Sequence, residues 1–502
     1  MGARVNGTST KQPDPKQTGP KHKPLPAKDT GAGRYRRLPT GAHSLDPEEV
    51  RRDQRERLQS ALVELTAERG FPAVRILDLT KLARVSRPTF YSLYKDKEDL
   101  FLAAFDEIAG RANQVVRDAY KGDGSPVERL RAAMLAFAEL AAAEPDAVSL
   151  LVLGGFGAGP QAFARRNQTL ESLEHGVATV RAAVGGAGRS GASRARKGPV
   201  QNDLTVRMIL GGIREVTAAR LRQHRAEELL SLMTDLAAWA ATYPLQLPAG
   251  LQPPRPARAT RRGAEDNGQE PSRRPSERAR QAEGRLPSGR HDLPRHFIIK
   301  NQRERIVDAT AEIVAEKGLA ALTIPDIAKR ANVSHQTFYE MYPTKQDAFL
   351  GAQKVGLHQA LGIAVEAYEA YTDDWPRGVA AGLRALLGYL ASEPAHAHLT
   401  VVDTFAASPL ATEIRDTGLH AFASYLQPGF HFPVGRSTPA IAPEAIAGGI
   451  WQVLHHYVEH DIVEQLPCAA PQLTFFTLAP FLGAKEAALV ARQAEKAAAK
   501  KK

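Results

Sequence analysis

Two short segments of this chain carry the same kinds of hydrogen-bonding side chains at the same spacing. Each has a threonine, a tyrosine two residues later and a lysine six residues after that, at Thr89, Tyr91 and Lys97 and at Thr337, Tyr339 and Lys345. Hydroxyl and ammonium groups can hold phosphate oxygens, and the free backbone amides at the start of a helix add to the same attraction. The two segments therefore predict binding to a phosphate-bearing partner.

The neighbours of these residues carry side chains that can distinguish the edges of bases. An arginine in the first segment can pair with guanine, whereas a glutamine and a glutamate in the second can bind adenine and cytosine. The positions are Arg87, Pro88 and Ser92 in the first segment and His335, Gln336 and Glu340 in the second. Because the two sets differ chemically, they would recognise different bases, and a DNA target read by both segments would be asymmetric, without two identical inverted half-sites.

Both segments belong to a long internal duplication. Gln54 to Leu102 aligns without a gap on Gln302 to Leu350, and about half of the positions are identical. A weaker match continues as far as Gly211-Gly212-Ile213 and Gly448-Gly449-Ile450. A repeat of this length has the size of a whole domain and is too long for a solenoid unit. The chain therefore contains two related domains in tandem.

The duplicated block has the pattern of a helix-turn-helix. Leu58, Ala61, Leu62 and Leu65 form one apolar stripe on a helix that Gly70 ends. The second copy repeats this pattern, and short second helices are expected at 76–83 and 324–331. The expected caps of the following helices are Ser86, Asp96, Thr323, Ser334 and Thr344. Two short helices joined by a tight turn and braced by longer ones are the helix-turn-helix plan.

This block resembles the DNA-binding signature of the TetR/AcrR family. The resemblance rests on residues 83–91, 94 and 97–100, and again on residues 331–339, 342 and 345–347. It implies that the third helix of each copy lies in the major groove of double-stranded DNA. It also implies that the paired threonines and tyrosines touch phosphate or the groove wall, and that Lys97 and Lys345 touch phosphate.

Ala- and Leu-rich helical patterns follow each block, and strand signals are nearly absent, so the predicted class is all-α. The resemblance implies two tandem units, each a three-helix DNA-binding domain followed by a helical body for ligand binding and dimerisation. The dimerisation faces are expected at 208–221 with 229–239, and at 446–462 with 473–482. On one chain the two faces meet at high effective concentration. An intramolecular pseudo-dimer is therefore predicted, and further homodimerisation is left open.

Changes in composition mark the boundaries between these parts. The stretch between the copies is dense in Pro, Arg, Gly and Glu, as flexible linkers are. The predicted parts are a basic tail at 1–46, a DNA-binding domain at 47–105, a regulatory body at 106–244, a linker at 245–293, a second DNA-binding domain at 294–352, a second body at 353–484 and a Lys/Ala-rich tail at 485–502.

The two copies differ at the turn and at the cap of the second helix, and the role of one tyrosine in each copy is open. The family usually has glycine in the turn and threonine before the second helix, but the first copy has Arg84 and Arg75 there. Asn332 and Thr323 are better suited to these positions in the second copy. Tyr94 and Tyr342 stand where a DNA contact and a place in the core are both expected.

The overall charge and the scarcity of cysteine limit the classes of function. A formal net charge of +11 favours an anionic partner. Cys468 is the single cysteine, which excludes an internal disulfide. We find no apolar stretch suited to a membrane span, and we expect a cytoplasmic location. His455, His456, His460 and Asp461 lie close together, but the first copy has no matching motif. We therefore expect no metal site, no cofactor and no enzyme.

The sequence thus predicts a sequence-specific DNA-binding transcriptional regulator. The favoured interpretation is a repressor that a small-molecule effector of unknown identity releases from DNA. The alternative is a related architectural or interaction protein that binds DNA loosely, through its basic tails, without an effector. A specificity ratio measured at physiological salt distinguishes the two, since loose binding depends strongly on salt and little on sequence.

Overall fold

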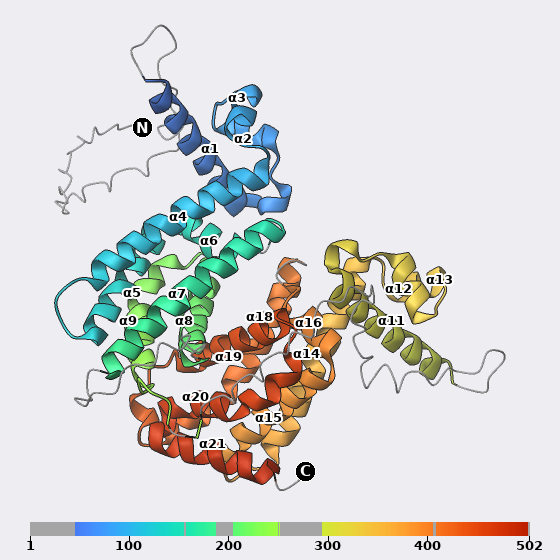
Figure 1. Ribbon diagram of the computed structural model, residues 1–502. Helices are drawn as coiled ribbons and strands as arrows, with labels where there is room; N and C mark the ends of the chain where they lie inside the picture. Colours follow the sequence, from blue (N-terminus) through green and yellow to red (C-terminus); the bar gives the residue numbers. More distant parts are fainter. Residues whose placement is uncertain are drawn as a thin grey trace, which may run out of the picture.

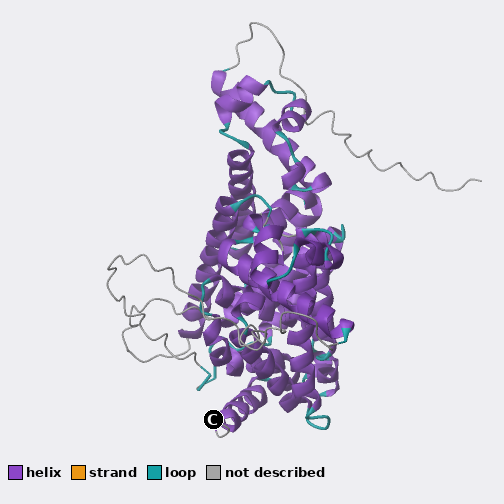
Figure 2. Cartoon of the chain, turned by 90° about the vertical axis from the view of Figure 1, so that its right-hand side faces the viewer, coloured by secondary structure: helices purple, strands orange, loops and turns teal. Residues whose placement is uncertain are grey.

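The computed structural model describes residues 46–154, 157–186, 204–248, 250–251, 294–404 and 408–499. In this part of the chain helices are joined by turns and loops, and no residue lies in a strand (Figure 2). The predicted all-α class is confirmed. The expected tail at 1–46 lies almost wholly outside the described residues, as does most of the linker expected at 245–293.

The first copy of the duplicated unit occupies residues 46–251. Its α-helices are α1 (Pro47–Arg69), α2 (Ile76–Leu82), α3 (Arg87–Leu93), α4 (Lys97–Tyr120), α5 (Pro126–Ala143), α6 (Pro145–Leu153), α7 (Pro160–Gly186), α8 (Leu204–Arg222) and α9 (Leu229–Ala241). Short 3-10 helices lie at η1 (Phe71–Ala73) and η3 (Ala226–Glu228). We call α1–α3 with the start of α4 the first head, and the remainder the first body.

The second copy occupies residues 294–499 and repeats this order. Its α-helices are α11 (Arg295–Lys317), α12 (Ile324–Ala331), α13 (His335–Met341), α14 (Lys345–Glu369), α15 (Trp375–Ser392), α16 (Pro394–Val401), α18 (Pro409–Ser424), α19 (Ala442–Glu459), α20 (Ala470–Leu482) and α21 (Ala484–Ala499). Short 3-10 helices are η4 (Leu319–Ala321), η5 (Gln427–His431), η6 (Gly435–Ser437) and η7 (Val463–Ala469). The second head is α11–α13 with the start of α14.

The helix boundaries in the heads follow from local hydrogen bonds. Gly70 and Gly318 end α1 and α11 with φ 76° each, a conformation that glycine adopts without steric cost. Ser86 Oγ accepts the Thr89 amide at 3.1 Å, and Ser334 Oγ accepts the Thr337 amide at 3.0 Å. These caps satisfy amides that the first turn of a helix cannot pair, so the sequence-predicted starts of α3 and α13 are confirmed.

Three hydrophobic cores hold the molecule together. Each head has its own core, around Phe90 and Phe101 in the first and around Phe338 and Phe349 in the second, all with 0–1% exposure. The third core is shared, because it contains residues of both bodies. Each of the first two cores also includes residues of its own body, such as Leu150 of α6 and Leu399 of α16, so each head packs on the body of its own copy.

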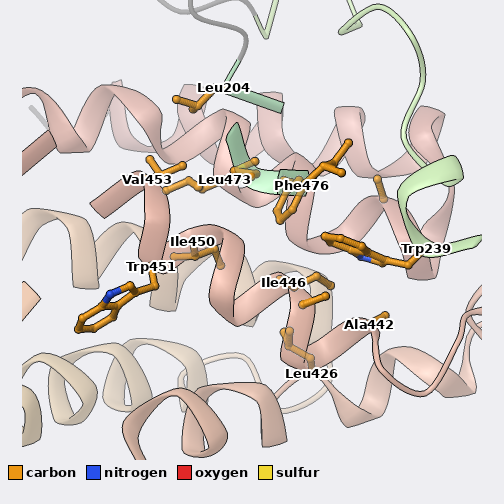
Figure 3. Packing of buried hydrophobic residues seen from close by; sticks show 14 of the residues in the cluster. Leu204, Trp239, Leu426, Ala442, Ile446, Ile450, Trp451, Val453, Leu473 and Phe476 are labelled. Carbon is orange, nitrogen blue, oxygen red and sulfur yellow. The ribbon is translucent and has the colours of Figure 1, made fainter. Parts of the chain in front are cut away.

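The shared core includes an aromatic contact between the two copies. Trp239 of α9 and Phe476 of α20 approach edge to face, with ring centroids 5.9 Å apart (Figure 3). Tyr243 stacks on the same Phe476 ring at 4.6 Å, and its hydroxyl donates to the Phe476 carbonyl at 3.0 Å. Aromatic pairs of this kind add to the free energy gained from burial alone.

Helices α8 and α19 cross so closely that only glycine fits where they meet. A Cβ atom on Gly212 would lie 2.3 Å from the Ala445 carbonyl oxygen, and one on Gly449 would lie 2.5 Å from the Met208 carbonyl oxygen. These are the paired glycines of the weaker part of the duplication. The two glycine pairs thus face each other across the contact between the copies.

The structure differs from two predicted boundaries. Residues 484–499 form the helix α21 rather than a tail, and Ala487, Ala488 and Ala491 are buried against the body with 0–1% exposure. The alanines of this segment allow close packing against the body. The lysines at the end of the chain had suggested a solvated tail instead. At the start of the predicted linker, Leu251 is buried and its carbonyl accepts the Gln472 side chain at 2.8 Å.

Candidate nucleic-acid interface

Helices α3 and α13 present the predicted reading residues on the outside of each head. Tyr91 is 58% exposed and Tyr339 is 55% exposed, although large aromatic rings are usually covered. The predicted base-reading residues are exposed as well, namely Arg87, Pro88, Ser92, His335, Gln336 and Glu340. Both helices therefore offer a polar edge with one exposed tyrosine to a partner.

Short-range hydrogen bonds hold several of these side chains in place. The hydroxyls of Thr89 and Ser86 lie 2.7 Å apart, and those of Thr337 and Ser334 lie 2.9 Å apart. The Gln336 side-chain amide donates to Glu340 at 3.1 Å. In this position Glu340 fixes the orientation of Gln336, the residue predicted to bind adenine.

The two lysines that begin α4 and α14 are bound to the protein backbone. Lys97 Nζ donates to the carbonyls of Phe71 and Val74 at 3.3 and 3.2 Å, and it lies 4.6 Å from the centre of the Phe71 ring. Lys345 Nζ donates to the Leu322 carbonyl at 2.8 Å. Both ammonium groups therefore hold the loop before the second helix, and their phosphate contact stays a prediction.

Tyr94 and Tyr342 differ in their surroundings. Tyr94 is only 6% exposed, its ring lies 6.1 Å from that of Phe90, and burial raises its pKa to about 12. The prediction of a DNA contact is therefore not supported for Tyr94, which belongs to the core. Tyr342 is half-buried, and burial raises its pKa as well. Spacing alone could not separate these two cases, because both tyrosines end the third helix.

An arginine braces the turn of each head, buried in the first head and half-buried in the second, and sequence reasoning missed it. Arg57 is 7% exposed, pairs with Asp53 at 2.6 Å and donates to the Ala83 carbonyl at 2.9 Å. Arg305 donates to the Asn332 carbonyl at 3.2 Å. Both arginines end the duplicated Gln-Arg-Glu-Arg motif, and their recurrence was the available signal. They link the first helix to the turn that orients α3 or α13.

The turns have the left-handed backbone that the family pattern implies. Arg84 has φ 53° and Asn332 has φ 51°. A side chain with a Cβ is strained there, although asparagine tolerates it better. The first copy also lacks a side-chain cap on α2, where Arg75 binds Asp78 at 3.0 Å, whereas Thr323 caps α12. The sequence difference between the heads is therefore a real difference in local stability.

Replacing Arg84 by glycine is expected to stabilise the first head. Arg84→Gly removes the left-handed strain and should raise the free energy of local unfolding by about 1 kcal/mol. The measurement is native-state hydrogen exchange of amides in α1–α3. Asn332→Gly is the matched control, for which we expect less than about 0.5 kcal/mol. Equal effects at the two sites would contradict the assignment of strain to Arg84.

The second head joins its body through buried polar groups. His396 of α16, 2% exposed, lies 3.1 Å from Asp308 of α11, and the Gln353 side chain donates to Thr404 and to the Ala411 carbonyl. Phe105 and Ala147 occupy the corresponding places in the first copy. The first copy therefore cannot form these polar contacts at the same two places.

The two heads lie at separate corners of the molecule. Figure 1 shows α3 and α13 at the outer ends of their units, with the joined bodies between and below them. Each body holds its own head, and the crossing of α8 and α19 sets the position of one body on the other. The geometry is that of two exposed short helices carried by one pair of joined bodies.

The heads match a known family of DNA-binding domains. The model of the bacterial regulatory proteins of the tetR family matches residues 58–104 and again residues 306–351. Each head thus matches the domain of this family. The predicted duplication and its family are thereby confirmed, since the matches cover the two blocks identified from the sequence.

Individual relatives share parts of this tandem TetR-type chain. It is 30% identical over 105 residues to the HTH-type transcriptional regulator HbdR from Aromatoleum sp. (strain CIB), a match that spans 21% of this chain and 45% of the relative. The chain thus aligns with less than half of that relative. The fatty acid degradation regulator FadR from Bacillus halodurans has 18% identity and a TM-score of 0.32, over 35% of this chain and 94% of that one.

The described residues include neither a membrane-spanning helix nor a metal-binding cluster. In that part of the chain no helix is long and apolar enough to cross a membrane. The same residues hold no group of three or more His, Cys, Asp or Glu side chains placed to bind a metal ion. His455 is instead buried between the two copies, 3.4 Å from Glu459.

Proposed function

We propose that this chain is a transcriptional regulator that reads one asymmetric operator with two unlike heads and responds to a small-molecule effector as a repressor. The family matches support a DNA-binding regulator. The observation that carries the proposal is the exposure of the predicted reading residues on both α3 and α13. Exposed polar edges on short helices are suited to the major groove. Such a protein acts in the cytoplasm of a bacterium, where the DNA is.

The contacts between the bodies support an intramolecular pseudo-dimer. Among the described residues three ion pairs join the copies, at shortest distances of 2.5–3.1 Å, and they are Arg220–Glu444, Arg222–Asp416 and Arg415–Glu215. Together with the glycine crossing and the shared core they join the two bodies at the face where TetR-type protomers would associate. One chain thereby presents two heads, as a homodimer ordinarily does. A native mass consisting only of dimers of the whole chain would count against it.

A cavity beside the second head supports a response to an effector. It has a volume of about 750 Å³ and lies between α11, α14 and α18. This volume suits a small molecule. Its lining is mostly apolar, including Val307, Leu361 and Ile414, and Lys300 and Arg303 stand at its α11 side. An occupant would contact both the first helix of the second head and the body, and its binding would bias their relative position.

Selection of bound DNA by the intact chain tests this function. We expect one enriched motif with two different half-sites. Tyr91→Ala should weaken enrichment of one half and Tyr339→Ala that of the other, each with a loss of affinity of about tenfold or more, as for one lost anchor of 1–3 kcal/mol. Val434→Ala, at an exposed site far from the heads, is the control and should change neither. Two identical inverted half-sites would refute the asymmetric operator.

A further inference from the structure

The cavity beside the second head, between α11, α14 and α18, carries an excess of positive charge. Lys300 and Arg303 of α11 and Lys354 of α14 line it, and Glu304 is the one carboxylate in its lining. The side chains of the three cations are exposed, and they form no ion pair or hydrogen bond within the described part of the chain. An occupant with a negative charge would complement them.

The apolar side chains of the same lining are all aliphatic. They are Val307, Val355, Leu357, Leu361, Ile414 and Ala421. Pockets of this kind bury the apolar body of a ligand, and a few polar groups fix its orientation. A ligand with an aliphatic body and one anionic end therefore matches both the apolar and the charged parts of the lining.

The corresponding place in the first copy is polar. Helices α1 and α11 begin at matching residues, since 295 − 47 = 248, and so do α4 and α14, since 345 − 97 = 248. Helices α7 and α18 begin at matching prolines, at a shift of 409 − 160 = 249. With these shifts four aliphatic residues of the cavity correspond to polar ones, namely Val307 to Gln59, Val355 to Glu107, Leu361 to Asn113 and Ile414 to Arg165. The aliphatic lining is therefore a property of the second copy.

An ion pair occupies this place in the first copy. Arg165 of α7 donates to Asp106 of α4 at 2.8 Å. Asp106 corresponds to Lys354, and Arg165 corresponds to Ile414. The second copy thus has a lone cation and an aliphatic side chain where the first copy has a closed pair of charges. A ligand anion would take the place of the missing carboxylate beside Lys354.

We propose that the cavity beside the second head binds one aliphatic organic anion per chain, and that the first copy binds none at the matching place. This rests on the proposed function in taking the cavity as the effector site. The anionic end contacts Lys354 and the two cations of α11, while the aliphatic body lies against the apolar lining. Because the anion links α11 to α14, it acts on the second head alone.

Isothermal titration calorimetry of the intact chain tests the class of ligand in the absence of DNA. The probes are octanoate, octan-1-ol and octylammonium, which share one aliphatic body and differ in charge. We expect octanoate to bind once per chain and about tenfold more tightly than the other two, as for one charge-assisted hydrogen bond. Two equal sites per chain, no binding of octanoate, or no preference for the anion would overturn the proposal.

Two variants of the cavity test where the anion binds. Lys354→Gln removes one exposed charge at nearly the same size and should weaken octanoate binding by about tenfold. Lys354→Asp combined with Ile414→Arg transplants the ion pair of the first copy and should abolish binding. Lys485→Gln, at an exposed position at the start of α21, is the matched control and should bind octanoate as the unaltered chain does. Unchanged binding in both cavity variants would place the anion elsewhere and overturn the proposal.

Ligand binding and release of DNA are separate measurements, so the two proposals can fail separately. If octanoate binds as expected but leaves the affinity for DNA unchanged, the anion site is correct and the effector response of the proposed function is wrong. If a neutral or cationic molecule releases the DNA and octanoate does not bind, the effector response is correct and the anion site is wrong.

Discussion

A single methyl group at Gly212 should loosen the association of the two copies. Its carbon would lie 2.3 Å from the Ala445 carbonyl oxygen and 2.7 Å from the Trp239 ring. A backbone oxygen cannot move aside as a flexible side chain can, so α8 and α19 must separate. Overpacking of this kind costs about 1–3 kcal/mol, and we expect Gly212→Ala to lie at the upper end. Gly212→Leu should undock the bodies altogether.

Denaturant unfolding and small-angle scattering measure these two effects. The undocked Gly212→Leu chain should keep its helix content and show a larger radius of gyration. Gly362→Ala is the matched control, because its added methyl group meets nothing within 4 Å on the exposed side of α14. There we expect a gain of about 0.5–1 kcal/mol, since alanine favours the helix. A compact, fully stable Gly212→Leu chain would contradict the close crossing.

Removing Arg415 should destabilise the joined bodies strongly. Its side chain is wholly buried and donates to Glu215 of the other copy at 3.0 and 2.5 Å. Arg415→Met leaves that carboxylate undercompensated, and breaking one side of a buried pair costs about 3–5 kcal/mol. The free energy of unfolding in urea measures the loss. Arg51→Met, in a surface pair with Glu48, should cost less than about 1 kcal/mol.

The double replacement of Arg415 by Met and Glu215 by Leu separates charge from packing. Apolar side chains of similar volume often restore what a broken buried pair loses. We therefore expect the double variant to recover most of the stability. If both variants are equally unstable, the loss comes from packing, and the charge assignment is wrong.

The same ion pair gives the stability a dependence on pH. Burial raises the pKa of Glu215, but the charge and hydrogen bonds of Arg415 outweigh this, and the pKa lies at about 2 instead of 4.5. The folded state therefore binds this proton less readily than the unfolded state. The resulting stability is complete above pH 4.5 and is lost as the pH falls towards 2. In the Glu215→Gln variant the free energy of unfolding should depend less on pH in that window.

Much of each head could be predicted from the sequence because its determinants are local. The caps at Ser86 and Ser334, the glycines that end α1 and α11, and the left-handed turn residues act within a few positions of the chain. Because the block is duplicated, each helix pattern occurs twice in the sequence, and each copy supports the prediction made from the other. Side chains whose role depends on distant contacts were harder to place. Tyr94 fits the pattern of a DNA contact but fills the core, and the hold of Lys97 on the loop before α2 has no local sequence signal.

By itself the sequence determined the helical class, the two tandem heads and the exposed side chains that could read DNA. These follow from periodicity and from short-range hydrogen bonding. Only the tertiary structure decided how the bodies join, which arginines are paired across them and where α21 lies. Such contacts link residues some 200 positions apart, as Glu215 and Arg415 are. No local pattern encodes a partner at that separation, because the partner is chosen by the packing of whole helices.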